Sequence, residues 1–110
     1  MKDFLILSRE PDGRMDVHSD EDNREHQQKV KRWMEPLIAS GNLSGGRALT
    51  LNGRVVDAKR EAQKDIYEVG REIVGGYMLI KSNDLDQATE IIRSCPVLDR
   101  GDFAEVREVM

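Results

Sequence analysis

The chain has 110 residues, 38% of them hydrophobic and 35% charged, and its formal net charge at pH 7 is −4. A chain this short is expected to form one domain, residues 1–110, with a small core, because it buries only about 60–68% of its unfolded surface. Basic and acidic residues are interleaved, so the chain offers no positive field for a phosphate backbone, and we expect no nucleic-acid partner.

The apolar runs are too short for a signal sequence or a membrane span. We therefore expect a cytoplasmic protein without a membrane partner. The single cysteine, Cys95, cannot form an internal disulfide, which agrees with a reducing compartment.

The first predicted element is a buried strand over Phe4–Leu7, a short apolar run followed by polar residues. The turn residues Pro11, Asp12 and Gly13 end it. Residues 11–22 then read as a polar loop.

A helix is predicted from about Asp20 to Ser40. Ser19 and Asp22 have the separation of a capping box, and Gly41 suits a left-handed end. Pro36 is expected to kink the helix or restart its last turn, because it has no N–H to donate. Apolar residues recur at the three- and four-residue spacing of one helix face: Val30, Trp33, Met34, Leu37 and Ile38.

A hairpin is predicted next, with strands over Leu43–Leu51 and Arg54–Val56 joined by Asn52 and Gly53, a strong two-residue turn signal. Residues 57–72 are polar, and we expect them to form an irregular segment that leaves the sheet between two strands. Ile73–Lys81 is a strongly apolar central strand.

A second helix follows Asp84 and Gln87, its expected cap, and stops at Pro96; its apolar stripe includes Cys95, which we interpret as inert packing. Phe103–Val109 is the last strand. The predicted order is β-α-β-β-β-α-β, an α+β fold of the ferredoxin-like type with an added hairpin.

Both faces of the predicted sheet carry apolar side chains and are expected to be buried. Phe4 and Ile6 alternate with Leu5 and Leu7 in the first strand, and the central strand repeats this pattern. Two helices cover only one face, so we expect a homodimer in which the other faces of two sheets meet.

Several motifs resemble those of the YCII-related family, also called the DGPF-motif family. Trp33 lies eight residues before Gly41, the Leu-x-Gly-Gly segment matches residues 43–46, and Gly75, Gly76 and Tyr77 match the later Gly-Gly-aromatic signature. The Asp-Gly-Pro-Phe tetrapeptide falls on Lys64–Tyr67, where only the aromatic is kept in kind.

The resemblance implies a dimeric α+β barrel and leaves two classes of function open. One is a dimeric protein that binds a small molecule in a cleft between the first helix and the sheet, with a role in stress-linked regulation. The other is a lyase or isomerase that needs no cofactor and uses a histidine with a carboxylate.

The resemblance also implies an acid–base histidine near Val30. His26 lies one turn earlier on the same stripe, so it is the candidate general base, oriented by Asp57 or Asp65. The alternative is a histidine at the solvated end of an amphipathic helix.

The expected cleft would bind a small, flat, anionic molecule between aromatic walls and a guanidinium. Its candidate residues are Trp33, Arg47, Arg54, Tyr67, Glu72 and Tyr77. The alternative places Trp33 in the core.

We expect no cofactor, because the glycines of residues 70–76 lack phosphate-loop spacing. We also expect no metal site, because the metal-capable side chains lack ligand spacing; they are His18, Asp20, Asp22 and His26.

Overall fold

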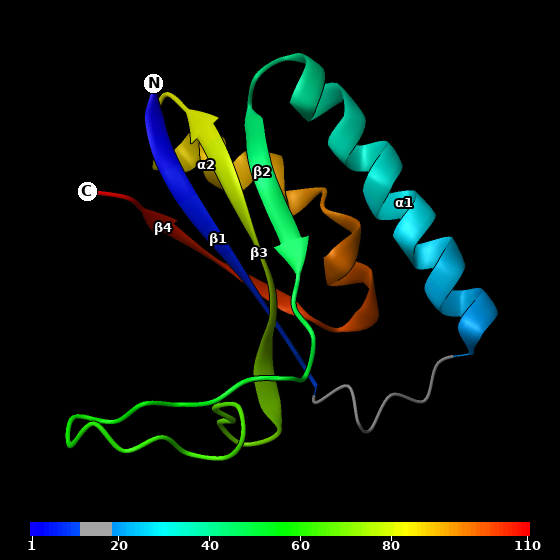
Figure 1. The fold of residues 1–110 in the computed structure, drawn as a ribbon. Coiled ribbons are helices and arrows are strands. Elements are labelled where there is room, and N and C mark those ends of the chain that lie inside the picture. Colours follow the sequence, from blue (N-terminus) through cyan, green and yellow to red (C-terminus); the bar gives the residue numbers. More distant parts are fainter. Residues whose placement is uncertain (12–18) are drawn as a thin grey trace.

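A four-stranded sheet with the order β2-β3-β1-β4 carries both helices on one face (Figure 1). The structure, a computed structural model, describes residues 1–11 and 19–110. Its elements are β1 (Lys2–Pro11), α1 (Asp20–Ala39), β2 (Leu43–Ala48), β3 (Glu72–Ser82), α2 (Leu85–Arg93), the 3-10 helix η2 (Pro96–Arg100) and β4 (Phe103–Glu108). The α+β class and the ferredoxin-like arrangement are confirmed.

All strand pairs are antiparallel, and their register separates the two faces. Phe4 pairs with Ile80 and Ile6 with Met78, so these side chains share the face that carries the helices. Leu5 pairs with Leu79 on the other face, which we call the open face.

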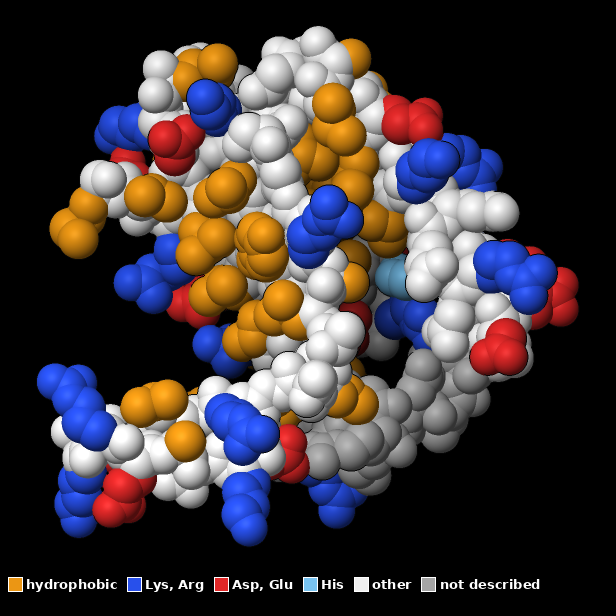
Figure 2. All heavy atoms as spheres, in the orientation of Figure 1, with side chains coloured by type: hydrophobic (Ala, Val, Ile, Leu, Met, Phe, Trp, Pro, Cys, Tyr) orange, Lys and Arg blue, Asp and Glu red, His pale blue; other side chains and the backbone are white. Residues whose placement is uncertain are grey.

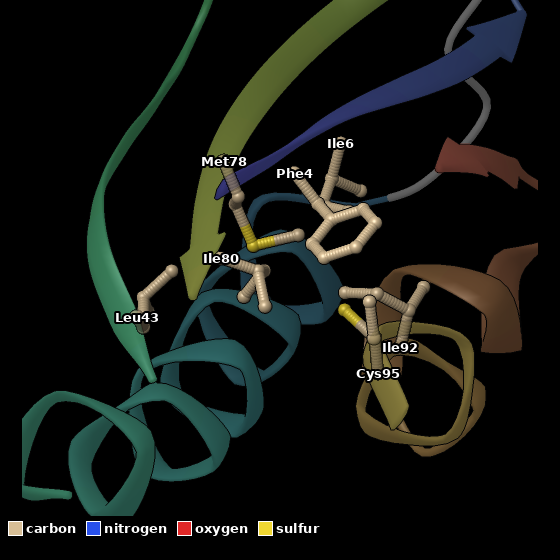
Figure 3. Close-up of a cluster of buried hydrophobic side chains, with 8 residues drawn as sticks. Phe4, Ile6, Leu43, Met78, Ile80, Ile92 and Cys95 are labelled. Carbon is tan, nitrogen blue, oxygen red and sulfur yellow. The ribbon is translucent and has the colours of Figure 1, made fainter. Parts of the chain in front are cut away.

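The core lies between the sheet and α2 (Figure 3). Phe4, Ile6 and Ile80 are fully buried, and Ile92 and Cys95 pack against them. Burial raises the pKa of the Cys95 thiol, because the charged thiolate loses its hydration. The packing of Cys95 is therefore as predicted.

The first helix begins and ends where the caps predict. The Ser19 hydroxyl accepts a hydrogen bond from the Asp22 N–H at 3.1 Å, and Gly41 has a φ of 81°. The helix continues through Pro36 to Ala39. It has no fully buried residue, but the Trp33 indole N–H donates to the Ser94 hydroxyl at 3.0 Å and ties it to the end of α2.

The predicted hairpin is wrong. β2 ends at Ala48 and pairs with β3, and residues 49–71 form a projecting segment that we call the arm (Figure 1). The Val55 carbonyl accepts from the Gln63 N–H at 2.6 Å, so the arm folds back several residues after Asn52 and Gly53.

The true tip of the arm is built around Asp57. Its carboxylate accepts from the N–H groups of Lys59 at 2.9 Å and Glu61 at 3.0 Å, and Arg60 has a φ of 68°. This side-chain cap competes successfully with the Asn-Gly turn. The predicted turn at Asp12 and Gly13 lies outside the described residues. No helix among the described residues is long and apolar enough to cross a membrane.

Candidate functional site

A cleft of about 570 Å³ lies between α1, the sheet and the segment around η2. Its wall on α1 includes Asn23, His26, Val30 and Met34. Its floor is formed by the ends of β1, β2 and β3, and Arg100 and Asp102 close a third side. This volume is within the range of small-molecule sites.

Glycines make the floor of the cleft. A Cβ added to Gly46 would lie 2.7 Å from the Tyr77 carbonyl oxygen, and one added to Gly76 would lie 3.1 Å from the Arg47 carbonyl oxygen. The close approach of β2 and β3 therefore requires bare backbone at these positions. The same absence of side chains leaves the space between the sheet and α1 open.

Gly75 has a different neighbour. A Cβ there would lie 2.1 Å from Cδ and 2.2 Å from Oε1 of Glu10, so the Glu10 carboxylate rests directly on the Gly75 backbone. The register between β1 and β3 shifts beside this contact, between Ser8 and Arg9. The absence of a side chain at Gly75 thus leaves room for the Glu10 carboxylate on the floor of the cleft.

The cleft also collects charged groups. His26 reaches it from α1, Glu10 from β1, and Asp102 from the residue before β4. The β1–β4 ladder ends at the pair Arg9–Phe103, and the next residue of each segment, Glu10 and Asp102, lines the cleft. The Arg100 guanidinium donates to the Asn23 side-chain oxygen at 2.9 Å and holds η2 against α1.

These residue types can bind and transfer protons. An imidazole and a carboxylate in one cleft are residue types that serve in general acid–base catalysis. Of the predicted metal-capable residues, His18 lies outside the described residues. Within residues 1–11 and 19–110, no group of three or more His, Cys, Asp or Glu side chains is placed to hold a metal ion.

The two aspartates predicted to orient His26 lie on the arm. The Asp57 carboxylate caps the arm's tip, and the Asp65 carboxylate accepts from the Ile66 N–H at 2.8 Å. Neither lines the cleft within one chain. Among residues 1–11 and 19–110, the carboxylates that share the cleft with His26 are those of Glu10 and Asp102.

The predicted ligand residues on the body of the fold are divided between its two faces. Trp33 packs against the core. Arg47 and Tyr77 border the cleft, but they pair with each other on the register of the open face. Strand alternation therefore directs their side chains away from α1, and it is their backbone that meets the cleft.

The remaining predicted ligand residues, Arg54, Tyr67 and Glu72, lie on or beside the arm. Tyr67 and Glu72 line a second pocket of about 440 Å³ where the arm meets the sheet. Arg54 is exposed. The structure therefore separates these side chains from His26.

Glu10, Arg100 and Asp102 are cleft residues that sequence reasoning missed. Glu10 follows the apolar run of β1 at the same parity as Phe4 and Ile6, which would place it on the helix face. This odd–even position along the strand was the sequence feature that could have identified Glu10 as a cleft residue. Its presence in one cleft with Asp102 depends on β4 lying next to β1, which local patterns do not specify.

A model of the YCII-related domain matches residues 3–110, and the chain belongs to this family. Among solved structures it is similar to 5-chloro-2-hydroxyhydroquinone dehydrochlorinase from Burkholderia phenoliruptrix in complex with 2,5-dihydroxybenzoquinone. The identity is 16%, the match covers 94% of this chain and 90% of the other, and the TM-score is 0.56, which supports the shared fold. Comparison with curated proteins finds no match.

Proposed function

We propose that the chain binds a small, flat, polar molecule in the cleft between α1 and the sheet. The observation that carries this proposal is the glycine floor, which leaves about 570 Å³ open beneath His26 and beside Glu10. A site with apolar walls and a few converging polar groups is typical of small-molecule binding.

The lining favours a hydroxylated ring. Val30, Met34 and Met78 offer apolar contact, while His26 and Glu10 offer hydrogen bonds to ring substituents. The similar dehydrochlorinase was solved with 2,5-dihydroxybenzoquinone, a ligand of this kind. In a stress-linked regulatory role, occupancy of the cleft would be the signal.

A second candidate function is acid–base catalysis without a cofactor, of the lyase or isomerase type. It is favoured by the presence of His26 and Glu10 in one cleft. His26 would accept a proton from a hydroxyl or an activated C–H of the ligand, and Glu10 would stabilise the resulting imidazolium. In an isomerisation the same proton would return to the ligand at another position, and in an elimination it would leave with the departing group, so neither reaction requires an oxidant or reductant.

The binding test uses 2,5-dihydroxybenzoquinone as the probe, followed by calorimetry and thermal unfolding. Binding at a probe concentration of about one hundred times Kd would stabilise the fold by about 2.7 kcal/mol. His26→Ala should weaken binding. Gln28→Ala, an exposed position on the same helix, should not. Absence of binding at millimolar probe would refute this ligand class.

Catalysis is tested by NMR as loss of the probe's ring C–H signal in D₂O. A proton-transferring site should accelerate exchange above the protein-free rate, and His26→Ala should remove that acceleration. If the probe binds but exchanges at the protein-free rate, the acid–base proposal is wrong while the binding proposal stands.

A homodimer formed through the open face is part of the same proposal. This face carries Leu5, Leu7 and Tyr77, which are half-buried, and Leu79, which is 38% exposed. Figure 2 shows hydrophobic side chains gathered over the sheet. Light scattering at micromolar concentration should give twice the 12.5 kDa mass of one chain. A monomer would refute the pairing of sheets.

A further inference from the structure

Arg100 brings a permanently charged hydrogen-bond donor to the cleft. It is the last residue of η2, it is half-buried, and it lines the cleft between α1 and the sheet. A guanidinium keeps its charge in proteins and donates hydrogen bonds without accepting any. It is therefore the opposite of Glu10, whose carboxylate accepts.

Both ends of the Arg100 side chain are held in place. The guanidinium donates to the Asn23 side-chain oxygen at 2.9 Å, in a partly buried position. The backbone of Arg100 ends a 3-10 helix that starts at Pro96 and is followed by Gly101, which has a φ of 81°. A donor that is fixed before a ligand arrives loses little conformational entropy when the ligand binds.

A second arginine borders the cleft, but its side chain is directed elsewhere. Arg47 is exposed and pairs with Tyr77 on the register of the open face, so strand alternation turns its side chain away from α1. Among residues 1–11 and 19–110, Arg100 is therefore the arginine whose guanidinium belongs to the helix side of the cleft.

The charged groups of the cleft differ in what they can exchange with a ligand. The carboxylates of Glu10 and Asp102 accept hydrogen bonds when ionised, whereas the Arg100 guanidinium donates them. A ligand hydroxyl that faces a guanidinium must still find an acceptor for its own O–H. A carbonyl oxygen has no such requirement. A ring that carries both a carbonyl and a hydroxyl therefore suits this cleft better than a ring that carries hydroxyls alone.

We propose that Arg100 selects ligands with a ring carbonyl, and that Asn23 is a positioning residue for the guanidinium. The carbonyl oxygen accepts from Arg100, while a hydroxyl of the same ring donates to the Glu10 carboxylate. The ligand class is a hydroxylated quinone or a similar cyclic ketone, and not a polyphenol. This inference rests on the proposed binding of a small molecule in the cleft and adds which ligand oxygen is recognised, and by which residue.

Two probes with the same ring and the same number of oxygens test this selection. One is 2,5-dihydroxybenzoquinone, and the other is its two-electron reduced form, a tetrahydroxybenzene with hydroxyls in place of both carbonyls. Anaerobic calorimetry on the full chain gives a Kd for each. The readout is the carbonyl preference, which is the Kd of the reduced probe divided by the Kd of the quinone. A purely structural change affects both constants alike, so this ratio separates recognition from structural support.

The wild type should prefer the quinone by about tenfold or more, as expected for a hydrogen bond to a charged group. Arg100→Met should weaken quinone binding by about ten- to a hundredfold and bring the carbonyl preference close to one. Arg93→Met is the matched control, because Arg93 lies on α2, is 69% exposed and does not line the cleft. It should leave both constants at the wild-type value.

Two variants of Asn23 test the positioning role and still probe the proposal if Arg100→Met does not fold. Asn23→Ala removes the acceptor of the 2.9 Å bond and should reduce the carbonyl preference. Asn23→Asp keeps an acceptor oxygen and should preserve it. An unchanged preference in Asn23→Ala would refute the positioning role.

The remaining outcomes distinguish this inference from the proposed function. If Arg100→Met weakens both probes equally, its bond to Asn23 serves to hold η2 against α1, and recognition of the carbonyl is refuted. If Arg100→Met binds the quinone as the wild type does, the selection is refuted while ligand binding in the cleft stands. If the wild type binds neither probe at millimolar concentration, both proposals are refuted.

Discussion

Replacement of Gly75 by alanine tests whether ligand binding depends on the position of the Glu10 carboxylate. The new Cβ would lie 2.1 Å from Cδ, 2.2 Å from Oε1 and 2.6 Å from Cγ of Glu10, so the carboxylate must move by more than 1 Å to restore van der Waals contact. The backbone does not oppose the change, because Gly75 is not among the glycines with positive φ, which in the described part of the chain are Gly41, Gly70 and Gly101.

The expected loss of stability is small and the expected loss of binding is large. Turning a side-chain end into a poorer rotamer costs about 0.5–1.5 kcal/mol. Loss of a hydrogen bond from the ligand to the charged Glu10 costs about 1.5–3 kcal/mol, which is roughly ten- to a hundredfold in Kd. Binding is therefore more sensitive to Gly75→Ala than unfolding is.

The assay is calorimetric titration with the quinone probe, accompanied by urea unfolding. Gly45→Ala is the matched control, because Gly45 does not line the cleft and an added Cβ there would meet nothing within 4 Å. In a Glu10→Gln background, Gly75→Ala should add little further loss. Wild-type affinity in Gly75→Ala would show that the position of the Glu10 carboxylate is irrelevant to the ligand.

Three further predictions concern the core and its edges. Phe4→Ala should lower the free energy of unfolding in urea by about 3–5 kcal/mol, because Phe4 is fully buried; a loss below about 1 kcal/mol would contradict its central place. Trp33→Phe should cost about 0.5–1.5 kcal/mol by removing the hydrogen bond to Ser94, with unchanged probe affinity. Iodoacetamide should alkylate Cys95 far more slowly in the native state than in urea, since burial raises its pKa. For the same reason stability should fall as pH rises above the ordinary thiol pKa, because the unfolded thiol ionises first; rapid native alkylation would contradict this.

Local chemistry predicted most of the fold. The caps at Ser19 and Asp84 are formed, with Asp84 accepting from the Gln87 N–H at 2.8 Å, and the left-handed Gly41 ends the first helix region as expected. These features depend on residues three or four positions apart. The sequence therefore contains them directly.

The hairpin prediction is wrong because other contacts compete with the Asn-Gly turn, and this changes which strand pairs with β2. Asn52 and Gly53 are a strong turn signal, but Gly53 instead accommodates the Ile66 side chain, and Asp57 caps a turn further along. β2 is thereby left to pair with β3 across the glycines. A turn propensity of this kind is weaker than the packing and capping that compete with it.

Spacing along the chain was enough to predict both helices, the first, central and last strands, the helix face of the sheet and the two-sided apolar pattern, because these features are local. Assembly of the strands was needed to show that Glu10 rests on Gly75, that Asp102 lines the same cleft, and that Asp57 and Asp65 are on the arm. The physical reason is that the site joins residues whose contact depends on strand order and on the missing side chains of glycines, neither of which has a local signature.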